Sequence, residues 1–153
     1  MGADEVNHFF RAYQVSEGTF LAEQYDNRLG GSLPLCVKEV EGRYRPFTYF
    51  TDYKFTREAY TALFDIPATS SERVFLDFPN TAYYSALNYI PYALPFYVAR
   101  KLHLSMGFAY YTGKLLVFLI FFFGMRYSIR IIPFLKWSLC LIALLPMQLY
   151  VLS

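Results

Sequence analysis

The chain has 153 residues, of which 56% are hydrophobic and 21% aromatic, and its formal net charge is +2. All 12 acidic residues lie at or before Asp77, so the rest of the chain lacks the charges of both signs that a soluble surface carries. The scattered basic residues form no stripe, which excludes a nucleic-acid footprint, and the composition predicts a membrane protein.

The first predicted element is an amphipathic helix over residues 4–15 (DEVNHFFRAYQV). Acidic residues at its start suit the helix dipole. Its apolar side is formed by Val6, Phe9, Phe10 and Tyr13.

Residues 1–81 form a polar region. After the first helix, only loops and short elements are predicted in it. The Gly30-Gly31 pair predicts a loop. Short alternating stretches around Gly42 predict a hairpin over residues 35–49. Residues 55–64 are predicted to form one or two helical turns, and residues 65–80 are predicted to form a loop.

The composition of the sequence changes at Ala82, where a tyrosine-rich segment begins. Residues 82–105 are rich in tyrosine and contain Pro91 and Pro95, which break a straight helix. Tyrosine-rich amphipathic segments favour the membrane–water interface. Interfacial or re-entrant helices are therefore predicted here.

Two transmembrane helices are predicted in the last third of the chain. The first covers residues 106–125, and at 1.5 Å per residue its most apolar part reaches about 28 Å, close to the hydrocarbon thickness. The second covers residues 137–153 and is loosened at Pro146.

The basic loop between these spans predicts their orientation. Residues 126–136 carry three basic residues and no acidic one, which places this loop in the cytoplasm and residues 1–105 on the extracytoplasmic side. Arg100 and Lys101, just before the first span, argue in the opposite direction.

The densest group of candidate functional residues lies on the first helix. Asp4, His8 and Arg11 fall at i, i+4 and i+7 and share a face, while Glu5 and His8 are an i, i+3 pair. A carboxylate beside an imidazole binds a divalent cation such as Mg²⁺ or Mn²⁺, or acts as a general base. The alternative is that Asp4 only caps the helix and His8 is solvated.

Other candidates are cations and tyrosines. Lys114 lies about 12 Å into the first span, and either faces a phosphate in a membrane cavity or snorkels to the surface. Arg43 and Arg45 either bind an anionic group or belong to a solvated strand face. The tyrosines of residues 83–97 either stack on sugar rings or form an interfacial belt.

Four segments in chain order carry a family resemblance. Residues 4–14 (DEVNHFFRAYQ) match a D-E-x-x-H-F-x-R-A-Y-Q element, and residues 28–34 (RLGGSLP) match a GG-x-x-P loop. Residues 84–91 (YSALNYIP) match a Y-S-P-L-x-Y-L-P segment with Ala86 in place of proline, and residues 141–150 (LIALLPMQLY) match an ALLPM-x-L helix. The chain thus resembles the bacterial family catalogued as domain of unknown function 2142 (DUF2142).

That family is similar to the C-class glycosyltransferases (GT-C), multi-pass enzymes that take sugar from a polyprenyl-phosphate carrier at the bacterial cytoplasmic (inner) membrane. The resemblance implies a mainly α membrane protein: a GT-C-like fragment with an extracytoplasmic loop region, interfacial helices and two transmembrane helices. It implies that Asp4, Glu5 and His8 are catalytic and that Asp4 and His8 hold a divalent metal. It also implies that Arg11 and Lys114 bind the substrate phosphate.

The expected function is sugar transfer in cell-surface polysaccharide or cell-wall biosynthesis, with the lipid bilayer and a polyprenyl-phosphate-linked sugar as partners and no nucleic acid. The family's first transmembrane helix and a later acidic motif are expected outside these residues, and the fragment alone is expected to be inactive. One alternative is a non-catalytic membrane component of polysaccharide export or assembly. The other is an inactive truncated remnant.

Overall fold

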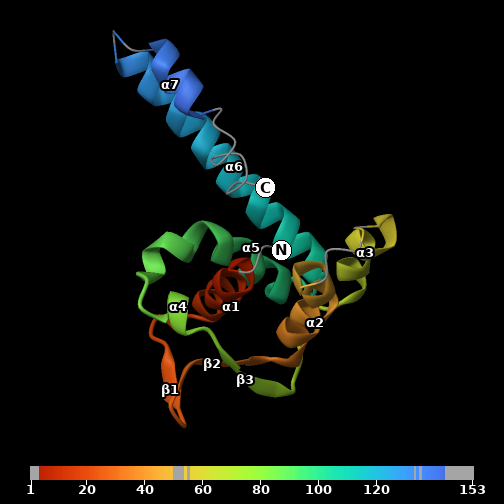
Figure 1. Cartoon of the computed structure of the whole chain (residues 1–153). Helices are drawn as coiled ribbons and strands as arrows, with labels where there is room; N and C mark the ends of the chain where they lie inside the picture. Colours follow the sequence, from red (N-terminus) through yellow and green to blue (C-terminus); the bar gives the residue numbers. More distant parts are fainter. Residues whose placement is uncertain (1–3, 50–53, 55, 133, 135, 144–153) are drawn as a thin grey trace. The chain divides into compact units, whose positions relative to one another are not determined.

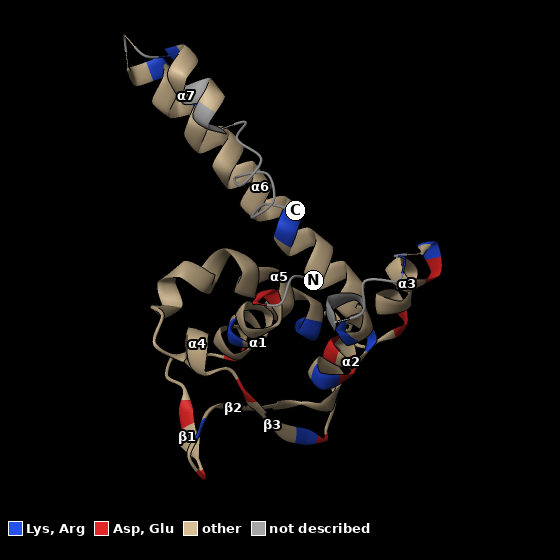
Figure 2. Ribbon diagram, in the orientation of Figure 1, with Lys and Arg blue, Asp and Glu red and all other residues tan. Residues whose placement is uncertain are grey.

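The computed structural model describes residues 4–49, 54, 56–132, 134 and 136–143. The chain divides into two compact units, Met1–Gly113 and Lys114–Ser153. The described elements are mainly helical, which confirms the predicted fold class at this level. Figure 2 marks acidic residues in red on elements of the first unit, and it shows none on the helices that follow Asp77.

The first unit combines short helices with a three-stranded sheet (Figure 1). Its elements in chain order are α1 (Glu5–Ser16), β1 (Glu23–Tyr25), β2 (Arg28–Pro34), α2 (Leu35–Tyr49), α3 (Arg57–Thr61), the 3₁₀ helix η1 (Ala62–Asp65), β3 (Arg73–Asp77), α4 (Pro79–Ala82), the 3₁₀ helix η2 (Ala86–Tyr89), α5 (Ile90–Lys101) and the first turns of α6 (Met106–Ile131). Helix α1 contacts α2, α5 and β2, and Figure 1 shows it at the centre of these elements.

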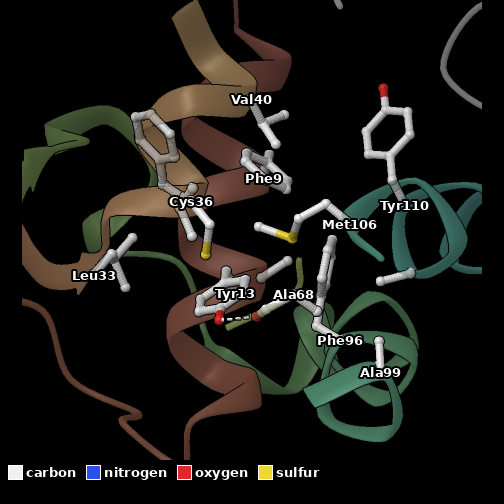
Figure 3. Close-up of a cluster of buried hydrophobic side chains, with 14 of the residues drawn as sticks. Phe9, Tyr13, Leu33, Cys36, Val40, Ala68, Phe96, Ala99, Met106 and Tyr110 are labelled. Carbon is white, nitrogen blue, oxygen red and sulfur yellow. Dashed lines mark hydrogen bonds between the residues drawn. The ribbon is translucent and has the colours of Figure 1, made fainter. Parts of the chain in front are cut away.

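Helix α1 carries much of the core and confirms the helix predicted over residues 4–15. Phe9 and Tyr13 on this helix are buried, and the centroid of the Phe96 ring on α5 lies 5.5 Å and 5.6 Å from theirs. The hydroxyl of Tyr13 donates a hydrogen bond of 2.6 Å to the carbonyl of Ala68 (Figure 3). These contacts pack α1 against α5 and join it to the segment that contains Ala68.

The sheet occupies two segments that were predicted as loops, residues 28–34 and part of residues 65–80. Strand β2 lies in the middle and pairs antiparallel with β1 and β3. A Cβ added at Gly30 would lie 1.9 Å from the carbonyl oxygen of Leu76 on β3. The glycine therefore permits close approach of the two strands and does not mark a loop.

Helix α2 occupies residues 35–49, so the hairpin predicted there is wrong. Cys36, Val40 and Tyr44 are buried and lie at i, i+4 and i+8, the spacing of one helix face. A Cβ at Gly42 would meet nothing within 4 Å, because this glycine lies on the exposed face. Burial also raises the pKa of the Cys36 thiol.

Residues 82–105 are largely helical, as predicted, and their prolines do not break α5. Pro91 lies in the first turn of α5, where its missing N–H removes no helical hydrogen bond. Pro95 lies inside the helix and is buried. The location of this segment at the membrane interface stays a prediction.

The second unit contains the rest of α6 and helix α7 (Lys136–Ala143). Helix α6 has 26 residues, about 39 Å at 1.5 Å per residue. Within the described part of the chain, it is the one helix that is long and apolar enough to cross a membrane. The first predicted span, residues 106–125, lies inside it.

The predicted loop over residues 126–136 is wrong over its first half. Helix α6 continues to Ile131, so Arg126 and Arg130 lie on its last turns. The sequence contains no helix breaker there before Pro133. Most of the second predicted span, residues 137–153 with Pro146, lies outside the described residues, and this span stays a prediction.

Candidate functional site

The acidic start of α1 forms a side-chain cluster with the end of η2. Asp4 stands at the N-cap position, yet its side chain makes no capping hydrogen bond. One carboxylate oxygen lies 3.5 Å from Nε2 of His8, and these side chains are 66% and 44% exposed. The predicted i, i+4 pair therefore forms, and the side chain of Asp4 is engaged with the imidazole instead of the helix end.

His8 is held between Asp4 and two tyrosines. Its Nδ1 lies 2.8 Å from the hydroxyl oxygen of Tyr89, a hydrogen bond whose donor depends on the imidazole tautomer. The imidazole also stacks on the rings of Tyr84 and Tyr89, with centroids 6.0 Å and 5.8 Å away. The ring orientation of His8 is thus set from both of its nitrogens and from its face.

Tyr89 supplies the buried end of this chain of hydrogen-bonding groups. Burial raises its pKa to about 12, and the nearby charge of Arg11 opposes that shift. Its phenol consequently keeps its proton at neutral pH. In the tautomer in which Tyr89 donates to Nδ1, Nε2 of His8 carries the proton that faces Asp4. We refer to Asp4, His8 and Tyr89 as the Asp4 cluster.

Glu5 points to a different partner than its neighbour Asp4. Its Oε1 accepts a hydrogen bond of 2.5 Å from the hydroxyl of Tyr110 on α6. Successive residues of a helix lie about 100° apart, so adjacent acidic residues face different neighbours. Glu5 and Asp4 therefore do not act as a pair of converging carboxylates.

Arg11 does not reach the exposed part of the site, although it follows Asp4 by seven positions. It is 2% exposed. Its guanidinium donates hydrogen bonds to the side chain of Gln14 and, at 2.7 Å, to the carbonyl of Phe20. Burial lowers the pKa of Arg11. The loop after α1 covers this turn of the helix, so the geometry does not support the predicted phosphate-binding role of Arg11.

Lys114 belongs to the second unit and lies half-buried on α6. Its predicted binding of a phosphate stays a prediction. Arg43 lies on helix α2 and not on a strand, and its guanidinium pairs with Glu39 at 2.9 Å. This i, i+4 ion pair is an ordinary feature of a helix surface.

The tyrosines of residues 83–97 are candidates for stacking on sugar rings in the sequence, but the contact of two of them with His8 is not predicted there. Tyr84 and Tyr89 lie in the tyrosine-rich segment that composition assigns to an interfacial belt. These tyrosines lie near His8 because η2 and α5 pack on α1. The available signal was the match of residues 84–91 to a family segment, which placed these tyrosines in a motif.

The described residues include no group of three or more His, Cys, Asp or Glu side chains that could hold a metal ion. Asp4 and His8 supply two candidate ligands. Mg²⁺ is commonly held by one or two carboxylates together with substrate phosphates, so the carboxylate of Asp4 fits a cation that arrives with a phosphorylated substrate. The imidazole of His8 is a weaker ligand for such a cation, and its two nitrogens face Tyr89 and Asp4.

Comparison with known proteins gives one finding. The sequence model of a family described as predicted membrane protein (DUF2142) matches residues 1–153. No curated protein and no solved structure matches the chain.

Proposed function

The chain belongs to the DUF2142 family of predicted membrane proteins, and we propose that it is part of a membrane glycosyltransferase of the GT-C type. The donor is a sugar carried by polyprenyl phosphate, and the product belongs to the cell-surface polysaccharide or the cell wall. We place residues 1–105 on the extracytoplasmic side of the cytoplasmic membrane, where such donors are used.

The observation that carries this proposal is the Asp4 cluster. A half-exposed imidazole lies between an exposed carboxylate and a buried phenol, with 3.5 Å and 2.8 Å between the heteroatoms. When the hydroxyl of Tyr89 donates to Nδ1, the proton on Nε2 of His8 faces Asp4, and the exposed carboxylate is placed to accept a proton from an acceptor hydroxyl. The same residues head the first segment that resembles the family.

In the proposed reaction, an acceptor hydroxyl approaches Asp4 and His8. Its oxygen forms a bond to the anomeric carbon of the sugar while the bond from that carbon to the phosphate oxygen breaks. The hydroxyl proton passes to Asp4 or His8, and polyprenyl phosphate leaves with the electron pair. General-base assistance of this kind typically contributes a factor of about 10² to 10⁴ to the rate.

The remaining predicted residues take supporting roles. Glu5 is a positioning residue, because its hydrogen bond to Tyr110 joins α1 to α6. Asp4 and His8 would hold Mg²⁺ or Mn²⁺, which would neutralise charge on the donor phosphate. Lys114 keeps its proposed role as a cation for the leaving phosphate.

The test is release of polyprenyl phosphate in the presence of a cell-envelope fraction that supplies the acceptor hydroxyl, so the acceptor itself need not be identified. The protein, in the longest form that its gene encodes, is reconstituted in proteoliposomes with radiolabelled polyprenyl-phosphate hexoses and pentoses. We expect protein-dependent release from one of these donors. Absence of release from all of them, in folded protein, would favour the non-catalytic component of polysaccharide export or assembly.

A further inference from the structure

Helix α5 presents one unpartnered apolar face. Ile90, Leu94 and Tyr97 lie at i, i+4 and i+7, which is one side of the helix, and are 48%, 52% and 47% exposed. The opposite side, with Phe96 and Ala99, is buried in the core around α1. The exposed face is therefore a feature of a helix that is already firmly packed.

The loop after α1 extends this face. Phe20 is 59% exposed and Leu21 is 81% exposed. Phe20 lines the same open groove, of about 480 Å³, as Ile90, Leu94 and Tyr97. Two segments that are distant in the sequence thus contribute to one apolar surface. We call these five residues, Phe20, Leu21, Ile90, Leu94 and Tyr97, the α5 face.

Charge at the rim of the groove is positive. Lys101 is exposed, and its Nζ lies 5.8 Å from the centroid of the Tyr97 ring. Arg100 and Glu17 also line the groove and lie 3.6 Å apart, N to O. The carboxylate of Glu17 accepts two further hydrogen bonds, of 3.0 Å and 2.8 Å, from Arg73. The one acidic group of the groove is therefore neutralised by two arginines.

We propose that the α5 face docks on the surface of the phospholipid bilayer, with α5 lying along the interface. Aliphatic side chains and Phe20 enter the boundary of the acyl chains, Tyr97 lies at the level of the headgroups, and Lys101 meets anionic lipid phosphates. This combination of an apolar stripe, tyrosine and lysine is typical of interfacial helices. Basic residues next to a membrane are attracted to its anionic lipids.

Three observations favour the bilayer over a protein partner. Four residues separate the end of α5 from α6, the helix that is a candidate to cross the membrane, so the tether to the bilayer is short. The exposed charge of Lys101 is complementary to anionic headgroups. No acidic residue follows Asp77 that would oppose that attraction.

The test is the accessibility of spin labels in nanodiscs that contain anionic phospholipid. Single nitroxide labels are placed at Leu21, Leu94 or Tyr97. Oxygen, which concentrates in lipid, and the water-soluble chelate NiEDDA serve as the two relaxation agents. Labels at Ser71, which is exposed in the first unit, and at Leu115, which is exposed on α6, serve as the water and lipid references.

We expect the ratio of oxygen to NiEDDA accessibility to be severalfold higher at all three test positions than at Ser71. Ratios equal to that of Ser71 would show that the face meets water. Low accessibility to both agents would show that protein covers it. Either result would overturn the proposal. These variants keep the Asp4 cluster intact, so the outcome is independent of the proposed activity.

Discussion

Changing Asp4 to asparagine is expected to lower the release of polyprenyl phosphate by a factor of roughly 10² to 10⁴, the usual contribution of a general base. Asparagine keeps the size of the side chain but cannot accept the proton of the acceptor hydroxyl. It also removes the charge that faces Nε2 of His8 at 3.5 Å. The measurement is the initial rate of release in proteoliposomes at saturating donor.

The same substitution is expected to leave the fold unchanged. Asp4 is 66% exposed as a side chain and makes no capping hydrogen bond, so its charge contributes little to folding. Asp26→Asn is the matched control, because Asp26 is exposed in a turn where asparagine is equally suited to the positive φ of 46°. Full activity in the Asp4 variant, or equal loss in both variants, would contradict the proposed role.

Changing Gly30 to alanine is expected to unfold the first unit. The new Cβ would lie 1.9 Å from the carbonyl oxygen of Leu76, an overlap with backbone that no side-chain rotation relieves. Strand β2 would have to separate from β3, its longer partner in the sheet. We expect the free energy of unfolding to fall by more than about 4 kcal/mol, a loss that few point mutations cause. The readout is near-ultraviolet circular dichroism of the purified protein during thermal unfolding.

Gly42→Ala provides the matched comparison. Its Cβ would meet nothing within 4 Å, and Gly42 lies inside helix α2. Alanine is the better helix former, so we expect a gain of roughly 0.5–1 kcal/mol. A Gly30→Ala protein that melts at the wild-type temperature would contradict the register of β2 against β3.

Two helices could be predicted from the sequence because local pattern alone determines them. Polar and apolar residues of helix α1 recur with a helical period. Its apolar residues Phe9, Phe10 and Tyr13 are buried, although the last two turns are buried on every side. Helix α6 is apolar over most of its length, and a long apolar run is sufficient to predict a helix there. The helix extends to Ile131, beyond the predicted end at residue 125, because Arg126 and Arg130 continue it and arginine is a good helix former.

The sheet and α2 could not be predicted because they depend on tertiary pairing. Strand β2 contains two glycines, which read as a loop until β3 is placed beside them. The β1–β2 turn uses Asp26 and Asn27, both at positive φ, without the glycine that usually marks such a turn. In residues 35–49, charged residues interrupt the apolar positions closely enough to imitate the alternation of a strand.

The site was predicted in part. Asp4 and His8 are close because both lie on one helix, so spacing was sufficient. Tyr89 comes from another element, and no local pattern connects it to His8. Arg11 has the spacing expected for the same helix face. The helical period cannot reveal that the loop containing Phe20 covers this side chain.

The central claim is that the Asp4 cluster faces the compartment in which lipid-linked sugars are used. Cys36 is 3% exposed, so the native thiol is a poor reporter for this question. The reporter is therefore Ser71→Cys, an exposed position of the same unit, in a chain that also carries Cys36→Ala and Cys140→Ala. The measurement is its labelling by a membrane-impermeant maleimide in intact cells. We predict full labelling without lysis; labelling that appears only after lysis would place the cluster in the cytoplasm and contradict the account.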